Sequence, residues 1–277
     1  MFTILGAGGW IGSALVRRLA GSGQQVRAIF RDNWPAANES LGDVIYAIGL
    51  TADFRVRPFA TAEAHITVLT RALQSCRFDS FLYLSSTRVY LGASATTEQT
   101  AVSVRSADPD HLYNVTKLAG EALCLALPNP HIRVARLSNV VGTGDRSQNF
   151  LPAVLAEAGR TGSVTIRSAP DSEKDYIALD DVTALLEVIA TCGKQRLYNV
   201  ASGRNVSNRL IAELLRQHTG AEVTFAPSAP RIAFPRIAID RLAGEFGAPE
   251  TPFERVFAEV VNERWAARGE GLPVLQH

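Results

Sequence analysis

The fold is decided by the stretch Phe2-Thr3-Ile4-Leu5-Gly6-Ala7-Gly8-Gly9-Trp10-Ile11-Gly12. Its first four residues form an apolar run typical of a buried parallel strand, and a helical pattern of apolar residues follows the glycines. Glycines at this spacing allow a tight turn, close approach of the backbone to a phosphate, and close contact between helix and strand. The helix would direct free N–H groups at a pyrophosphate. The sequence therefore predicts a dinucleotide-binding turn, with cofactor contacts from Gly6, Gly9, Trp10, Ile11 and Gly12.

Composition narrows the class of protein. The chain has 277 residues, of which 47% are hydrophobic, and its formal net charge is +1. This length suits one large α/β domain or a cofactor domain with a smaller lobe, and the charge gives no case for nucleic acid or an anionic membrane as a partner. The three cysteines show no metal-ligand spacing and no disulfide framework, so we expect no metal. No apolar stretch is long enough to span a membrane. We expect a soluble, cytoplasmic protein.

The second strand, residues 26–30, bears on the choice of nucleotide. A cofactor with a free ribose 2′-hydroxyl usually meets an acidic residue near the end of this strand. Here the strand ends at Phe30, and Arg31 and Asp32 follow. Arg31 is suited to hold a 2′-phosphate, Asp32 is suited to reach a 2′-hydroxyl, and a solvated Arg–Asp pair is the third reading. We favour NADP(H), with NAD(H) as the alternative.

The segment from Asn33 to Gly42 is too short for the helix and strand that a doubly wound fold normally places there. Trp34 precedes Pro35, and a residue before proline is biased away from helix. One crossover unit is therefore expected to be abbreviated, which would leave the adenine side of the site more open. The next strand, residues 43–49, ends at Gly49, which we expect to contact the cofactor.

Alternating strand and helix patterns continue to the end of the chain. Asp181 and Ser207 stand where helix caps are expected. The further helices are expected at residues 60–76, 111–127, 150–159, 182–191, 208–219, 241–246 and 253–268, and the further strands at 81–84, 133–137, 164–166, 175–179, 197–200 and 223–225. We predict a Rossmann-type doubly wound parallel sheet formed by residues 1–145, to which 175–200 return. Residues 146–174 and 201–277 are expected to form a smaller α+β substrate lobe.

Tyr113 and Lys117 are the first candidates for acid/base catalysis. Residues four apart lie on one face of a helix, and a cationic Lys117 would lower the pKa of Tyr113 from its usual value of about 10. Such a pair can exchange a proton with an alcohol or carbonyl oxygen. Tyr and Lys at this spacing also occur by chance on many exposed helices. Ser85 and Ser86 end a buried strand, where their hydroxyls would either cap the strand or hold a substrate oxygen.

With these residues in hand, the chain resembles the extended short-chain dehydrogenase/reductase family of NAD(P)-dependent sugar-nucleotide epimerases, dehydratases and reductases. The resemblance runs along nearly the whole chain, and its markers occur in the order that the family has. They are Gly6-x-x-Gly9-x-x-Gly12, residues 84–90 (LSSTRVY), Tyr113-x-x-x-Lys117, residues 136–142 (RLSNVVG), 174–182 (KDYIALDDV) and 198–203 (YNVASG).

The resemblance implies roles for individual residues. Tyr113 resembles the catalytic acid/base, Lys117 the residue that lowers its pKa and binds the nicotinamide ribose, and Ser86 the catalytic hydroxyl residue. Asn139 and Asn149 match positions that contact the phosphates or sugar of a nucleotide sugar. Arg231 is similar in placement to an arginine that pairs with the diphosphate, although Phe234 stands where an acidic residue usually follows.

Departures from the family pattern narrow the expected reaction. Thr87 and Arg88 follow Ser86 where the 4,6-dehydratases carry an Asp-Glu pair, which argues against water elimination. We expect NADPH-dependent reduction of a keto-sugar nucleotide or similar polar carbonyl. The alternatives are an NAD-dependent sugar-nucleotide epimerase and a non-catalytic dinucleotide-binding protein.

The sequence also bears on assembly and on the remaining side chains. The family often forms homodimers through the Tyr-Lys helix, which the apolar residues Leu118, Ala122, Leu123 and Leu125 would permit. The five histidines show no ligand pattern and are expected at the surface or in local bonds. Trp265 is expected in the core or an interface.

Overall fold

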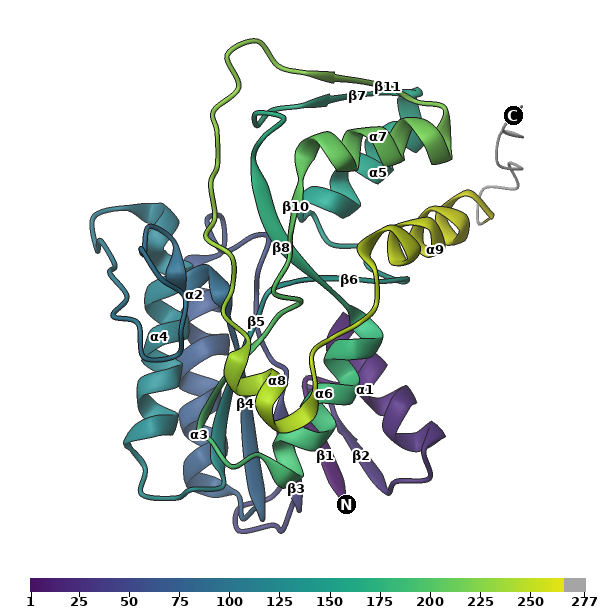
Figure 1. Cartoon of the computed structure of the whole chain (residues 1–277). Coiled ribbons are helices and arrows are strands. Elements are labelled where there is room, and N and C mark those ends of the chain that lie inside the picture. Colours follow the sequence, from purple (N-terminus) through teal and green to yellow (C-terminus); the bar gives the residue numbers. More distant parts are fainter. Residues whose placement is uncertain (267–277) are drawn as a thin grey trace.

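A six-stranded parallel sheet forms the centre of the computed structural model, which describes residues 1–266 (Figure 1). The strand order is β2-β1-β3-β4-β5-β9, and every pairing is parallel. The strands are β1 (Phe2–Leu5), β2 (Val26–Ile29), β3 (Asp43–Tyr46), β4 (Ser80–Ser86), β5 (Ile132–Leu137) and β9 (Leu197–Val200). Most of their residues are buried, as expected for a sheet covered on both faces. The predicted Rossmann-type α/β fold is confirmed.

Helices cover both faces of this sheet. One face carries α1 (Trp10–Gly21), α6 (Leu179–Cys192) and α8 (Asp240–Phe246), whose buried residues join one apolar core with the sheet. The other carries α2 (Pro58–Ala62), a π-helical turn (Glu63–Thr67), α3 (Val68–Ser75) and α4 (Leu112–Ala126), over a second core. None of the helices in residues 1–266 is long and apolar enough to cross a membrane.

The crossover between β2 and β3 is abbreviated, as the sequence predicts. Residues 30–42 connect the two strands without a helix or a further strand of the sheet, and β2 remains the edge strand. Leu41 is fully buried and Thr3 donates a hydrogen bond to its carbonyl at 2.6 Å, which holds the short connection against β1. The glycine turn after β1 therefore lies near an open edge of the sheet.

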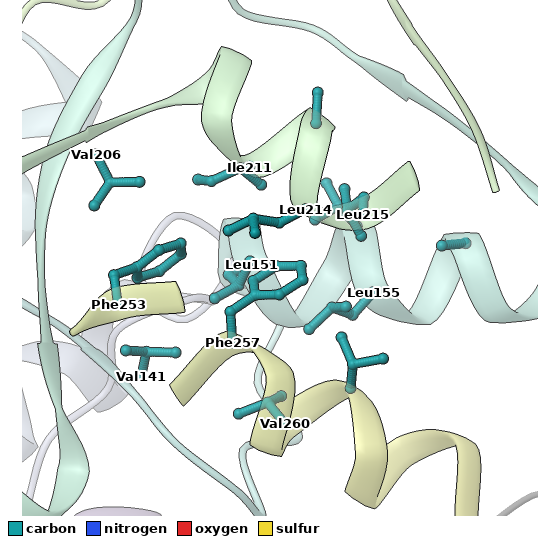
Figure 2. Close-up of a cluster of buried hydrophobic side chains, with 14 of the residues drawn as sticks. Val141, Leu151, Leu155, Val206, Ile211, Leu214, Leu215, Phe253, Phe257 and Val260 are labelled. Atoms are coloured by element: carbon teal, nitrogen blue, oxygen red, sulfur yellow. The ribbon is translucent and has the colours of Figure 1, made fainter. Parts of the chain in front are cut away.

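A second lobe lies beyond the carboxyl ends of the sheet strands (Figure 1). It contains a sheet of β6 (Asn139–Val141), β8 (Glu173–Ala178) and β10 (Asn205–Ser207), and a parallel pair of β7 (Ser163–Ile166) and β11 (Glu222–Phe225). Three helices, α5 (Phe150–Thr161), α7 (Asn208–Thr219) and α9 (Phe253–Ala266), bury a cluster that includes Leu151, Leu155, Leu215 and Phe257 (Figure 2). Trp265 belongs to this core. Helix α8 falls within the range predicted for the lobe, yet Leu242 packs it on the central sheet.

Several element boundaries differ from the sequence expectations. The expected helix 60–76 is interrupted by the π-helical turn, where the Ala64 carbonyl accepts a hydrogen bond from the Tyr46 hydroxyl at 2.6 Å. Asp181 does not cap α6, because the helix starts at Leu179 and the carboxylate instead accepts a bond from Thr251 at 2.8 Å. Ser207 does cap α7. The expected end of the last helix at Arg268 lies outside the described residues.

Candidate functional site

The glycine turn between β1 and α1 has the shape that a pyrophosphate requires. Gly6 has φ +91°, and an added Cβ would lie 2.9 Å from the Ile48 amide nitrogen. A Cβ on Gly12 would overlap the Gly6 carbonyl oxygen. Gly9 caps α1 without a side chain, and no acidic residue lies in the first turn to oppose an anion. The residues present therefore fit a dinucleotide cofactor.

Trp10 and Ile11 pack through their side chains. The Trp10 indole donates a hydrogen bond to the Thr143 carbonyl at 2.8 Å, which joins the glycine turn to the loop after β6. Ile11 packs against the core beneath α1. What these two residues offer a cofactor is therefore their backbone, as the first residues of the helix.

The end of β2 lies against the glycine turn. The amides of Gly6 and Ala7 both donate to the Ile29 carbonyl at 3.1 Å, and the Asn33 side chain accepts from the Phe30 amide at 2.6 Å. Arg31 follows directly and is exposed, without an ion-pair partner among residues 1–266. Its guanidinium is therefore free to meet the ribose side of a cofactor bound at the turn.

Tyr113 lies in the first turn of α4 and is buried. Its ring packs 5.6 Å from the Phe54 ring and edge-on 5.4 Å from the His65 ring. Burial raises the pKa of Tyr113 to about 12, and the interaction with Ser86 and the charge of Arg88 oppose this only in part. The sequence argument expected Lys117 to lower this pKa. That expectation is wrong, because loss of solvation outweighs the effect of the neighbouring charges on the pKa of Tyr113.

Lys117 lies one turn further along α4 and is also buried. Its Nζ donates to the Leu84 carbonyl at 2.9 Å, near the end of β4, and lies 5.9 Å from the centre of the Tyr113 ring. Burial lowers the pKa of Lys117 to about 7, against the charge of Glu121, which raises it. A Cβ on Gly49 would lie 3.3 Å from this Nζ. Gly49 thus keeps the backbone after β3 close to the lysine.

His65 is the buried neighbour of both residues, and the sequence analysis missed it. One ring nitrogen, Nδ1, lies 2.8 Å from the Thr116 hydroxyl, and the other accepts from the Leu50 amide at 3.3 Å. Burial and then the charge of Lys117 lower the pKa of His65 to about 2, so the ring is neutral. The accepting Nε2 assigns the proton to Nδ1, which donates to Thr116. An isolated histidine in a helical pattern carries no sequence signal for this role.

A buried ion pair joins β4, α4 and β5 behind the site. Arg136 donates to the Glu121 carboxylate at 2.6 Å and to the Tyr90 hydroxyl at 2.7 Å, and Ser85 donates to the same carboxylate at 2.5 Å. Ser85 is therefore held in the network. Ser86 remains beside Tyr113, and its Oγ accepts from the Arg88 amide at 3.2 Å.

The candidate substrate residues lie in or beside the second lobe. The Asn139 side chain donates to the Asp175 carbonyl at 2.7 Å, and Asn149 precedes α5 without capping it. Arg231 is about 60% exposed and pairs with Asp171 at 2.7 Å. The structure thus brings Ser86, Tyr113 and Lys117 together, while no contact joins Asn149 or Arg231 to them among the described residues.

Comparisons with known proteins agree with this arrangement. A family model described as "NAD dependent epimerase/dehydratase family" matches residues 44–201. A dTDP-glucose 4,6-dehydratase from Streptomyces griseus is 26% identical over 118 residues, which are 41% of this chain but only 36% of that protein. The chain therefore aligns with about a third of that curated relative.

Solved structures share the fold over almost the full chain. RMD from Pseudomonas aeruginosa, complexed with NADPH, has a TM-score of 0.77 at 23% identity, covering 95% of this chain and 98% of that one. UDP-glucuronic acid 4-epimerase from Bacillus cereus, in complex with UDP-glucuronic acid and NAD, has a TM-score of 0.79 at 17% identity, covering 96% and 99%. Because the family model spans more than half of the chain, the protein belongs to the NAD-dependent epimerase/dehydratase family.

Proposed function

We propose that this enzyme uses NADPH to reduce a keto-sugar nucleotide or a similar polar carbonyl compound. The observation that carries the proposal is the meeting of Ser86, Tyr113 and Lys117 at the carboxyl end of β4. With a pKa of about 12, Tyr113 keeps its proton at neutral pH, which is the state needed to protonate a carbonyl oxygen. Ser86 would orient that oxygen, and Lys117 would hold the nicotinamide ribose. The bound nicotinamide supplies the hydride.

Two features support reduction with NADPH over the other reactions of the family. The exposed Arg31 beside the glycine turn suits a 2′-phosphate, and the similar structure from P. aeruginosa is complexed with NADPH. Thr87 and Arg88 stand directly after Ser86, so this position offers no carboxylate for water elimination. The 4,6-dehydratase reaction of the S. griseus relative is therefore not the one we propose.

Substrate and assembly form part of the same proposal. A nucleotide sugar would extend from Tyr113 towards the second lobe, with Asn139, Asn149 and Arg231 as contacts. The B. cereus neighbour, which is in complex with UDP-glucuronic acid, supports this substrate class. We further propose a cytoplasmic homodimer that pairs the α4 helices, in which Ala122 is exposed and Leu123 half-buried.

Calorimetry with NADPH, NADP, NADH and NAD tests the cofactor, after a check for retained nucleotide by absorbance. We expect preference for the phosphorylated pair, lost in Arg31→Ala and kept in Arg17→Ala, an exposed arginine on α1. Oxidation of NADPH by a 4-keto-sugar nucleotide then tests the reaction. If the purified protein retains NAD and forms product without added NADPH, the reaction is epimerisation and the proposed reduction is wrong. Binding of none of the four nucleotides would contradict the enzyme proposal.

A further inference from the structure

Arg88 is a half-buried cation beside Tyr113 that forms no ion pair with a carboxylate among residues 1–266. It lies two residues after Ser86 in a short 3-10 helix (Thr87–Tyr90). Within residues 1–266 its buried Nε has no hydrogen-bond partner, and Nη2 donates to the Asp110 backbone carbonyl at 3.3 Å. A buried guanidinium donor left unpaired is costly, so a ligand that accepts a hydrogen bond from this Nε would stabilise the site.

The backbone holds Arg88 firmly at the site. Its amide donates to the Ser86 hydroxyl at 3.2 Å, and its carbonyl accepts from the Asn114 side chain at 3.1 Å. The guanidinium carbon lies 5.6 Å from the centre of the Phe54 ring, which itself lies 5.6 Å from the Tyr113 ring. The charge of Arg88 also lowers the pKa of Tyr113. The cation therefore borders the side chain that would protonate the substrate.

Lys174 is a second cation, close enough to Arg88 for the two charges to repel each other. It is half-buried on β8 and forms no side-chain hydrogen bond or ion pair with the rest of the described chain. Burial, and then the charge of Arg88, lower its pKa. The adjacent Asp175 does not neutralise it, because that carboxylate accepts bonds from Ser202 and from the Arg204 amide at 2.9 and 3.0 Å.

The nearby carboxylates are also engaged elsewhere. Asp110 pairs with Arg55 at 2.5 Å, and Asp108 pairs with Arg105 at 3.0 Å. Two partly buried cations thus lack an ion-pair partner of their own among residues 1–266, an arrangement that an anionic ligand would stabilise. A guanidinium with a free Nε, together with an ammonium, matches the planar oxygens of a carboxylate.

We propose that Arg88 and Lys174 bind a carboxylate carried by the sugar itself, so that the substrate class is a nucleotide-linked uronic acid or its keto form. The inference rests on the proposed function, because the reacting sugar must lie within hydrogen-bond reach of Tyr113. Groups that border Tyr113 then face substituents of the sugar ring. The diphosphate, attached at the anomeric carbon, extends away from them.

Pairs of nucleotide sugars that differ only in the sugar carboxylate test the site formed by Arg88 and Lys174. Binding of UDP-glucuronic acid and UDP-glucose, and of GDP-mannuronic acid and GDP-mannose, is measured by calorimetry on the full chain saturated with NADP. We expect the acidic member of at least one pair to bind about 10- to 100-fold more tightly, as a charge-assisted contact allows. Arg88→Gln and Lys174→Gln should each remove most of this preference and leave binding of the neutral sugar within about twofold. Arg17→Gln, at an exposed site on α1, should keep it.

The outcomes separate this inference from the proposed function. Equal binding of acidic and neutral sugars by the unmutated protein overturns the carboxylate site and leaves the nucleotide-sugar proposal standing. A preference that survives in both variants also overturns it. Binding of NADP with no binding of any of the four sugars removes the substrate class of the proposed function, and this inference with it.

Discussion

The two regions that flank the candidate site are held together by different kinds of contact. Around α4, polar groups are buried against one another, with Tyr113, Lys117 and His65 on one side and the Glu121–Arg136 pair behind them. The second lobe has an apolar core between α5, α7 and α9 (Figure 2). Its candidate substrate residues, Asn139, Asn149 and Arg231, are exposed.

This difference suggests that the geometry around α4 is fixed, whereas the surface residues of the second lobe can vary. A buried polar network is stable only when each member finds its partner, so it fixes one arrangement of Ser86, Tyr113 and Lys117. An apolar core tolerates exchange of similar side chains, so the lobe can present different surface residues on one frame. The chemistry is therefore expected to depend on α4, and the choice of substrate on the lobe and on the cations beside it.

The largest effect on activity is expected from Tyr113→Phe. Loss of the hydroxyl removes the proton donor, and kcat/KM should fall about 10²- to 10⁴-fold while NADPH binding stays within about twofold. Tyr176→Phe is the matched control, because Tyr176 is equally buried on β8, in the second lobe. Steady-state kinetics and calorimetry make the comparison. Full activity in Tyr113→Phe would contradict the assigned role.

Arg136→Met should have the largest effect on stability. It leaves the Glu121 carboxylate buried without its partner, and we expect a loss of about 3–5 kcal/mol in the free energy of unfolding, measured with urea. The double variant Glu121→Leu with Arg136→Met should recover much of this loss, because no unpaired charge remains. A single variant as stable as the parent would show that the network does not hold α4 in place.

Leu155→Ala tests the second lobe in the same way. Leu155 is buried in the apolar core, and its truncation should cost about 2–4 kcal/mol of unfolding free energy. NADPH binding at low denaturant should be unchanged, because the glycine turn lies in the other core. Loss of cofactor affinity together with stability would mean that the two regions do not act separately.

Sequence reasoning reached the central sheet because its signals are local. A buried strand, three spaced glycines and a helix follow one another within twenty residues. The connection after β2 is too short for a further helix and strand, so its length alone predicts the abbreviated crossover. Tyr113 and Lys117 share a helix face, so their proximity also follows from spacing. Ser86 meets them because strand ends converge at one edge of a parallel sheet.

The rest of the site depends on contacts between distant segments. His65 reaches Tyr113 from a π-helical turn, and the charge of Arg88 acts on Lys174 in β8 of the second lobe, which no periodicity in the sequence reveals. The pKa of Tyr113 was predicted in the wrong direction because the spacing shows the neighbouring charge and not the burial. Asp181 was predicted to cap a helix, but its carboxylate accepts a hydrogen bond from Thr251, which lies seventy residues away in the sequence.

The dependence of stability on pH also distinguishes the α4 region from the second lobe. The folded protein lowers the pKa of Lys117 to about 7 from its usual 10.5, so between pH 7 and 10 the unfolded chain binds one more proton at this residue. The contribution of Lys117 to the free energy of unfolding must therefore rise with pH across that window, by at most roughly 1.4 kcal/mol per pH unit. Lys117→Met should be the more stable protein near pH 7, and its advantage should shrink towards pH 9.5. Urea unfolding at several pH values, with Lys194→Met on an exposed loop as control, measures the difference. A constant difference would mean that Lys117 keeps its proton in the folded protein, and Tyr113 would then face a permanent positive charge.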